Sequence, residues 1–159
     1  IIRAIIKAIL KAILKAIMKA IIKAMIKAVL KTIIKGVIKA IAREHGYKIG
    51  KIDYILVNDE KILEINKQSL QHDYYTDIIT FDYSEKNVLE GEIYISIERV
   101  EENATLYKEL FHVELSRVVF HGILHMVGYK DKSKSESTKM REMEKIYINQ
   151  YLNAFHVEQ

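Results

Sequence analysis

The hydrophobic and polar positions of residues 1–40 follow a four-residue repeat of two large aliphatic side chains, a lysine and an alanine. Residues of these types favour a helix, and a continuous helix of this length would extend about 60 Å. Lysines at this spacing drift around the helix axis by about 40° per repeat. Apolar side chains then cover most of the circumference. We therefore expect residues 1–28 to form a helix that docks on its own domain or on a second copy of the chain.

The repeat excludes some settings for this helix and leaves others open. A transmembrane segment is not expected, because lysine recurs at every fourth position and charge is unfavourable at the bilayer centre. A signal peptide would have an uncharged core followed by a cleavage site, and neither is present. A basic amphipathic helix can bind a membrane surface. So regular a repeat is also typical of a designed or low-complexity assembly module that carries a passenger enzyme domain.

The pattern changes after residue 28 and predicts a separate domain over residues 29–159. We expect residues 29–45 to be its first helix, capped by Gly46. Alternating and β-branched runs predict strands over residues 51–58, 76–83 and 92–97, with a turn over residues 87–91. Further helices are predicted over residues 59–70, 98–107, 110–127 and from 137 or 138 to 152, with a polar loop at 133–137 and a frayed tail from 153. The predicted fold class is α+β, a small mixed β-sheet covered by helices with helix 110–127 at the centre.

Charge is divided unequally along the chain. Residues 1–43 hold eleven Lys and Arg and no acidic residue, whereas the remainder holds fourteen Lys and Arg against twenty-one Asp and Glu, a net charge of −7. The overall charge of +4 therefore belongs to the N-terminal segment and not to the domain. The chain contains no cysteine, which excludes disulfides and thiolate metal sites and favours a cytoplasmic location.

The candidate chemistry lies in the helix predicted over residues 110–127. His121 and His125 are one helical turn apart, so both imidazoles project from the same face and can bind one metal ion. Gly128 can end the helix and let Asp131 return to the ion as a third ligand. Three protein ligands and one open position are typical of a catalytic zinc site, so we expect one Zn²⁺ per chain.

Alternatives remain for this pair of histidines. Such pairs also occur as partly buried polar residues that bind no metal. A metal-dependent peptidase or amidase could use the same ligands, but it needs a carboxylate base. Zinc proteases with the H-E-x-x-H motif carry that base directly after the first histidine, where this chain has Gly122.

The stretch from His121 to Tyr129 resembles the core motif of the YbeY family, the bacterial endoribonucleases of rRNA maturation. Three other stretches agree with that family in order: 63–66, 73–81 and 91–96. Met140 and Glu144 fall where its last helix begins. The resemblance covers residues 30 to 150 approximately. It implies zinc-dependent cleavage of single-stranded RNA in the cytoplasm, with ribosomal RNA precursor and the ribosome as partners.

The sequence departs from this family at three places. A third histidine usually stands where this chain has Asp131, which keeps a ligand but changes its charge. Leu70 replaces an arginine that is common in the family. The family also opens with a short β-strand, and the N-terminal repeat predicts none.

Four further residues are candidates for the site. The resemblance places Thr76 and Asp77 at the metal cleft, where the carboxylate of Asp77 could orient water or an RNA hydroxyl. The alternative is that Asp77 only stabilises a turn. Lys130 and Lys132 flank the third predicted ligand and could hold a phosphate near the ion. The alternative is that both lysines are simply solvated.

Overall fold

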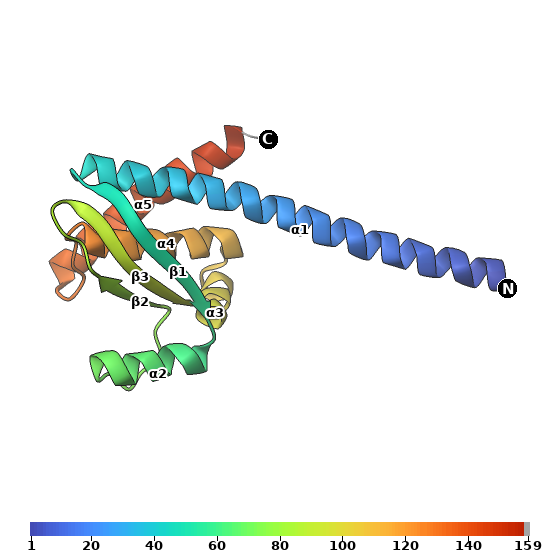
Figure 1. Cartoon of the computed structure of the whole chain (residues 1–159), viewed down its shortest axis with the longest axis horizontal. Coiled ribbons are helices and arrows are strands. Elements are labelled where there is room, and N and C mark those ends of the chain that lie inside the picture. Colours follow the sequence, from blue (N-terminus) through green and yellow to red (C-terminus); the bar gives the residue numbers. More distant parts are fainter. Residues whose placement is uncertain (158–159) are drawn as a thin grey trace.

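The computed structural model describes residues 1–157, except for the side chains of residues 19, 22, 23, 25, 26, 29, 30 and 155–157. Within this part the chain forms helices and strands in the order α1 (Ile2–Glu44), β1 (Lys48–Val57), α2 (Asp59–Leu70), β2 (Ile78–Asp82), β3 (Val88–Ser96), α3 (Ile97–Tyr107), α4 (Phe111–Met126) and α5 (Lys134–Val157). Figure 1 shows the sheet and its covering helices at one end of the molecule, and α1 extending far beyond them.

The sheet is mixed, which confirms the predicted α+β class. Its strand order is β1-β3-β2, with β1 parallel and β2 antiparallel to the central strand β3. Along β3 the residues at alternate positions are buried, namely Leu89, Gly91, Ile93 and Ile95. Since side chains alternate between the two faces of a strand, one face of β3 belongs to the core.

Helix α4 packs against the sheet and is the central helix of the domain. Phe120, Ile123 and Leu124 on this helix are fully buried. Gly122 lies where α4 comes nearest to the sheet. A Cβ atom there would be 2.8 Å from Ile78 Cδ1 and 3.0 Å from Thr80 Oγ1. Only glycine therefore allows this approach without a shift of the neighbours. Helix α5 and the C-terminal part of α1 also pack on α4.

Helix α1 confirms the predicted helical repeat but not its docking on its own domain. Among its described side chains, the buried ones all lie in the C-terminal part: Ile33, Val37, Ile38, Ile41 and Ala42. Because the helix continues straight past the end of this contact, the preceding turns project into solvent (Figure 1). The helix does not break at residue 28, and the division of the chain into 1–28 and 29–159 stays a prediction. Docking on a second copy stays a prediction as well.

The predicted bounds of β3 and α5 were wrong for identifiable reasons. The turn before β3 consists of Lys86 and Asn87 alone, both with positive φ, so β3 begins at Val88 rather than residue 92. Helix α5 begins at Lys134 and runs to Val157, so the expected polar loop and frayed tail are largely helical. Its start is fixed by a capping box: Ser133 N donates to Glu136 Oε2 at 2.9 Å, and Glu136 N donates to Ser133 Oγ at 3.1 Å.

Candidate metal centre and its cleft

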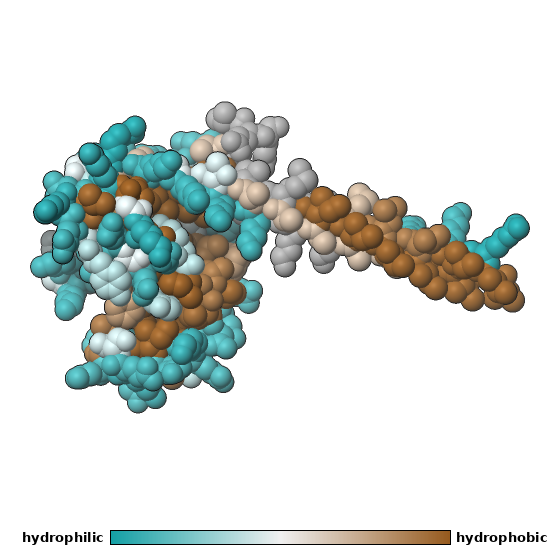
Figure 2. All heavy atoms as spheres, in the orientation of Figure 1, coloured by the Kyte–Doolittle hydropathy of each residue, from teal (hydrophilic) through white to brown (hydrophobic). Residues whose placement is uncertain are grey.

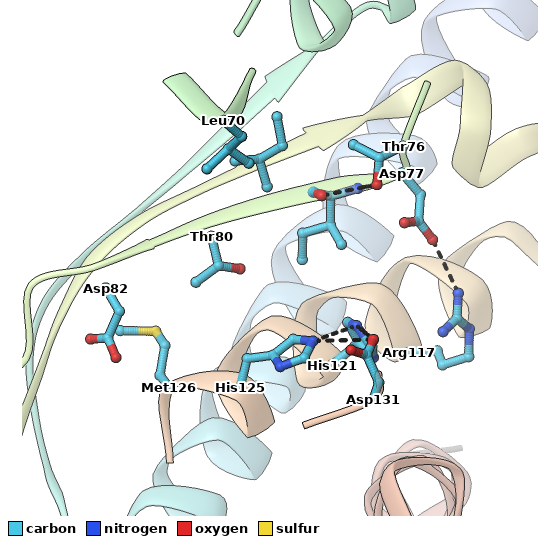
Figure 3. A pocket seen from close by; sticks show the side chains of 12 residues that line it. Leu70, Thr76, Asp77, Thr80, Asp82, Arg117, His121, His125, Met126 and Asp131 are labelled. Carbon is cyan, nitrogen blue, oxygen red and sulfur yellow. Dashed lines mark hydrogen bonds and ion pairs between the residues drawn. The ribbon is translucent and has the colours of Figure 1, made fainter. Parts of the chain in front are cut away.

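One face of α4 carries a stripe of polar side chains on an otherwise apolar helix. Glu114, Arg117, His121 and His125 follow one another at intervals of three or four residues, so they project in one direction. The stripe forms one wall of a cleft of about 500 Å³, and β2 with the loop before it forms the other wall. Figure 3 shows the cleft with its lining residues, which are Leu70, Thr76, Asp77, Ile78, Ile79, Thr80, Asp82, Arg117, His121, His125, Met126 and Asp131.

Three predicted ligand atoms meet at the floor of this cleft. His121 Nε2 and His125 Nε2 are 3.0 Å apart. Asp131 Oδ2 is 3.6 Å from the first of these atoms and 3.5 Å from the second. Four tetrahedral bonds of about 2.0–2.1 Å would place ligand atoms roughly 3.3 Å from one another. The three atoms are thus spaced as a metal ion would need them.

The position of Asp131 depends on how α4 ends. Gly128 has a φ of +106°, a left-handed conformation that glycine adopts without strain. The turn is held by the Gly128 amide, which donates to the His125 carbonyl at 3.0 Å, and by the Tyr129 amide, which donates to the Leu124 carbonyl at 3.0 Å. The chain therefore reverses directly after the second histidine and returns Asp131 to both imidazoles.

Hydrogen bonds on the far side of each ring fix which nitrogen faces the centre. His125 Nδ1 lies 2.9 Å from the carbonyl oxygen of Tyr129, which can only accept, so this nitrogen carries the proton. His121 Nδ1 lies 2.6 Å from Glu144 Oε1, and an ionised carboxylate likewise only accepts. In their neutral forms both histidines therefore direct an Nε2 lone pair at the other and at the carboxylate of Asp131. A cation between these atoms relieves that repulsion, and carbonyl and carboxylate partners of this kind are typical of metal-binding histidines.

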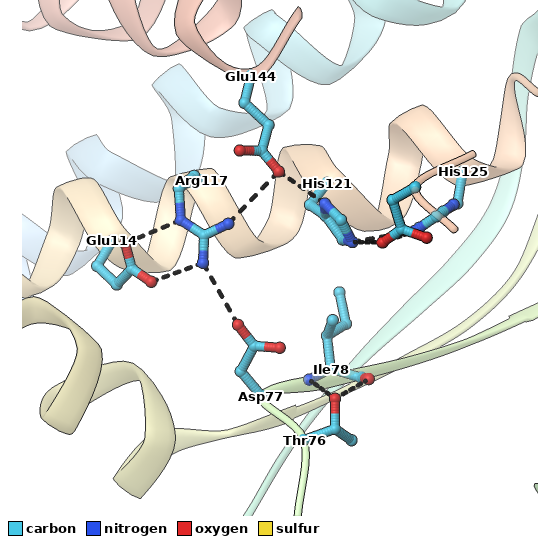
Figure 4. A network of polar contacts seen from close by, with 9 residues as sticks. Thr76, Asp77, Ile78, Glu114, Arg117, His121, His125 and Glu144 are labelled. Carbon is cyan, nitrogen blue, oxygen red and sulfur yellow. Dashed lines mark hydrogen bonds and ion pairs between the residues drawn. The ribbon is translucent and has the colours of Figure 1, made fainter. Parts of the chain in front are cut away.

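Arg117 lies beside the three ligand atoms and is surrounded by carboxylates (Figure 4). Its Nε and Nη2 donate to the two oxygens of Glu114 at 2.9 and 2.7 Å. It also reaches Glu144 at 3.4 Å and Asp77 at 3.3 Å. Burial by itself would lower the pKa of Arg117, but hydrogen bonding to Glu114 and the charges of all three acids outweigh burial and raise the pKa above its ordinary value. The guanidinium therefore stays charged and holds Glu144 where it meets His121.

The structure brings together most of the predicted site residues. His121, His125, Asp131, Thr76 and Asp77 all line the cleft. The carboxylate of Asp77 is paired with Arg117. The hydroxyl of Thr76 donates to the carbonyl of Ile78 at 3.1 Å and so belongs to the turn before β2.

The remaining candidates lie at or outside the edge of the cleft. Leu70, which stands where the family commonly has arginine, lines the cleft and is 43% exposed. Lys130 and Lys132 are exposed on the loop between α4 and α5 and are not among the lining residues. Their contact with phosphate stays a prediction.

Sequence reasoning missed the network that supports the histidines. Glu114 and Arg117 had a signal, because they continue the helical stripe of His121 and His125 toward the N-terminus of α4. Spacing along the chain provided no signal for Glu144, because Glu144 lies on α5 and meets His121 only after the chain has folded. Thr80 was also missed. Its Oγ1 is buried at the cleft without a hydrogen-bond partner among the described residues.

The position of Gly122 removes the usual base of a zinc protease. It is buried against β2 and β3, and a side chain there would run into Ile78, Thr80 and Ile93. A glutamate at this position would face the sheet rather than the ligand atoms.

Among the described residues, no helix is long and apolar enough to cross a membrane.

Comparison with known proteins identifies the class to which this fold and cleft belong. A family model described as an endoribonuclease matches residues 12–152. This range includes the whole sheet, α4 and most of α5. The chain belongs to the endoribonuclease YbeY family, which confirms the resemblance of its motifs.

Several curated relatives carry the same family name. "Endoribonuclease YbeY" of Parabacteroides distasonis is 50% identical over 104 residues, which are 65% of this chain and 73% of that protein. The protein of that name from Flavobacterium psychrophilum is 51% identical over 110 residues, 69% of this chain and 76% of its own length. That of Christiangramia forsetii is 50% identical over 121 residues, 75% of this chain and 80% of its own length.

One solved structure has the same fold. The solution structure of TM1509 from Thermotoga maritima superimposes with a TM-score of 0.60 at 32% sequence identity. The match covers 82% of this chain and 87% of that chain.

Proposed function

We propose that the chain is a zinc-dependent endoribonuclease that cuts single-stranded RNA, with ribosomal RNA precursor as its substrate. The observation that carries the proposal is the meeting of His121 Nε2, His125 Nε2 and Asp131 Oδ2 at the floor of an open cleft. Family membership supplies the reaction class, RNA cleavage. A ribosomal RNA precursor would be met on the ribosome in the cytoplasm, where we place the protein.

The residues present fit a zinc ion. Two imidazole nitrogens and one carboxylate oxygen are ligands that Zn²⁺ accepts, and a zinc ion that they held could take a fourth ligand from solvent or substrate. Zinc held in this way supplies Lewis acidity toward a phosphate oxygen and lowers the pKa of water. Glu144 accepts a hydrogen bond from Nδ1 of His121, and the Tyr129 carbonyl accepts one from Nδ1 of His125, so each ring is held in its orientation. Arg117 in turn holds Glu144.

Asp77 is the candidate for handling a proton in the cleft. Arg117 holds its Oδ2 at 3.3 Å, which fixes the orientation of the carboxylate. Its other oxygen can then accept a hydrogen bond from water or from an RNA hydroxyl, while Thr76 shapes the turn that carries Asp77. The position of Asp77 and Thr76 in the same cleft as the three ligand atoms supports these two roles.

Single-stranded RNA suits the surroundings of the cleft. Tyr74 and Tyr75 are 57% and 50% exposed just before Thr76, and aromatic rings at such a rim can stack on unpaired bases. The Arg99 guanidinium lies 4.7 Å from the centroid of the Tyr75 ring and fixes it from one side. Lys130 and Lys132 lie on the loop that carries Asp131 and could contact phosphates of the bound RNA.

The metal centre is tested by metal analysis of the purified protein. We expect about one zinc per chain, and we expect His121→Ala and His125→Ala each to empty the site. Asp131→Ala should weaken binding less. His72→Ala is the control, because His72 is exposed and contacts Tyr74 rather than the ligand atoms. Full zinc content in the double variant of His121 and His125 would refute the ligand assignment.

The reaction is tested on single-stranded RNA and on casein-like peptides with the same preparations. We expect cleavage of RNA that is lost with His125→Ala, and no cleavage of peptides because Gly122 provides no base. Binding of uncleaved RNA should also weaken when a chelator removes the metal. Peptide cleavage that depends on His125, with RNA left intact, would assign the site to a peptidase instead.

A further inference from the structure

The projecting part of α1 exposes an unusual number of large aliphatic side chains. Each of them is between 50% and 100% exposed: Ile1, Ile2, Ile5, Ile6, Ile9, Leu10, Ile13, Leu14, Ile17, Met18 and Ile21. Figure 2 shows a largely hydrophobic surface on the outer part of the projecting helix. A helix that is apolar around most of its circumference is normally buried. This surface therefore requires a partner.

A second exposed apolar surface lies where α3 ends and α4 begins. Leu106, Tyr107, Leu110 and Phe111 form this α3–α4 patch and are 70%, 60%, 66% and 41% exposed. Figure 2 shows hydrophobic side chains on this side of the domain, below the point where α1 leaves it. The patch lies outside the cleft, and none of its residues lines that cleft. Clustered apolar exposure of this kind is typical of an interaction site.

The two surfaces are complementary in charge. The exposed residues around the α3–α4 patch include the acids Glu101, Glu102 and Glu109 and the base Lys108, and Glu102 is paired with Arg99 at 3.0 Å. The charged residues of the projecting helix are all basic. Long lysine side chains can extend along an apolar contact and place their ammonium groups at its edge, where the glutamates would be. Such complementarity favours a contact of α1 with the patch.

Within one chain this contact does not form, because the straight helix leads its apolar surface away from the patch. We propose that a second copy of the chain is the partner: the N-terminal helix of each chain packs on the α3–α4 patch of the other. The exchange is reciprocal, so it closes as a two-fold symmetric dimer. This inference is independent of the proposed RNA cleavage, since neither surface contains a cleft residue.

The helix is long enough to provide such an interface. At 1.5 Å per residue, residues 1–28 extend about 42 Å, and a cylinder about 10 Å across has a lateral surface of roughly 1,300 Å² at that length. A stable interface needs about 800 Å² from each partner. The helix supplies this area when somewhat more than half of its circumference is buried, against the patch and against the helix of the partner.

The oligomeric state of the full chain in solution tests the proposal. Light scattering after gel filtration should give twice the chain mass of 18.5 kDa. Tyr107→Glu and Leu106→Glu place a charge in the patch and should each weaken dimerisation at least tenfold. Tyr83→Glu is the matched control, because Tyr83 is 57% exposed, close to the 60% of Tyr107, but directly follows β2 and lies outside the patch.

A mixing experiment tests the reciprocal exchange. The double variant Ile5→Glu with Ile9→Glu should be monomeric because its helix no longer fits the patch, and Tyr107→Glu should be monomeric because its patch is blocked. Mixed together, one chain offers an intact helix and the other an intact patch, so a heterodimer should form. Circular dichroism would confirm that each variant is folded.

Three results would overturn the proposal. One is a monomer at 100 µM protein, the second is a dimer that Tyr107→Glu and Leu106→Glu leave as tight as before, and the third is failure of the two folded variants to pair. Co-sedimentation of a monomeric full chain with vesicles containing anionic phosphatidylserine would assign the helix to a membrane surface instead.

Discussion

Replacement of Arg117 by methionine is the most informative single perturbation of the site. Glu114 is only 2% exposed, and both of its oxygens are bound by this one guanidinium. Methionine keeps most of the volume but leaves a buried carboxylate without its partner. Breaking a buried ion pair on one side destabilises a protein by about 3–5 kcal/mol. Because Arg117 itself is 27% exposed and water can partly enter, we expect about 3 kcal/mol, the lower end of this range.

The free energy of unfolding, measured by urea denaturation at pH 7, gives the magnitude. Adding Glu114→Gln to Arg117→Met should recover part of the loss, because a neutral amide at position 114 no longer needs a cation. Arg99→Met is the matched control, because Arg99 pairs with Asp59 and Glu102 nearer the surface, and we expect a loss of about 1 kcal/mol or less.

The same variant should also affect the metal. Without Arg117, Glu144 loses one of the contacts that hold it against His121. Loss of such outer partners typically lowers metal affinity by about 10–100-fold. A variant that unfolds within about 1 kcal/mol of the parent, with no recovery in the double variant, would refute the view that Glu114 is a buried charge held by Arg117.

Two other predictions concern Glu144 and Tyr151. Glu144→Ala removes the acceptor 2.6 Å from His121 Nδ1 and should weaken zinc binding by about 10–100-fold in a chelator competition. Glu144→Gln can still accept this hydrogen bond and should weaken zinc binding less. Equal losses in the two variants would contradict an orienting role for Glu144. Burial raises the pKa of Tyr151 from 10.0 to about 12, so its contribution to stability should be complete below pH 10 and be lost between pH 10 and 12. Burial also raises the pKa of Tyr54, Tyr94 and Tyr147, so an ultraviolet titration should show several late tyrosines and one fewer in Tyr151→Phe. An unchanged curve would refute the shift.

Local pattern was sufficient to predict much of the fold. The bounds of α2 were predicted to the residue, because Asn58 is a strong N-cap whose side chain accepts from the Lys61 amide at 2.8 Å. The three ligand candidates could be predicted for a similar reason. His121 and His125 share one helix face, and Gly128 provides the turn that returns Asp131. All of these relations lie within a few residues of one another.

What could not be predicted depends on contacts between distant segments. Glu144 meets His121 across 23 residues, and only the packing of α5 on α4 places it there. The pattern of α1 showed that an apolar surface must be buried, but it did not show how far the domain extends beneath the helix. Gly91 was expected in a turn, yet it lies within β3, where a Cβ would contact the Phe81 carbonyl of the neighbouring strand. The pairing of β2 with β3 decides that position.

Two of the three departures from the family pattern, at Leu70 and Asp131, have a common electrostatic consequence. Leu70 in place of arginine removes a positive charge from the cleft, and Asp131 in place of histidine adds a negative one. The charged lining residues are then Asp77, Asp82 and Asp131 against Arg117, a net charge of −2 with neutral histidines.

A cleft of this charge repels the phosphates of RNA, and residues 44–159, with a net charge of −7, do not compensate. A divalent cation on the three ligand atoms brings the lining to zero. A metal ion bound by these atoms would therefore have a second function beside its chemistry. It would make the cleft acceptable to a polyanion, so RNA binding should depend on the metal more strongly here than in relatives that keep the arginine and the third histidine.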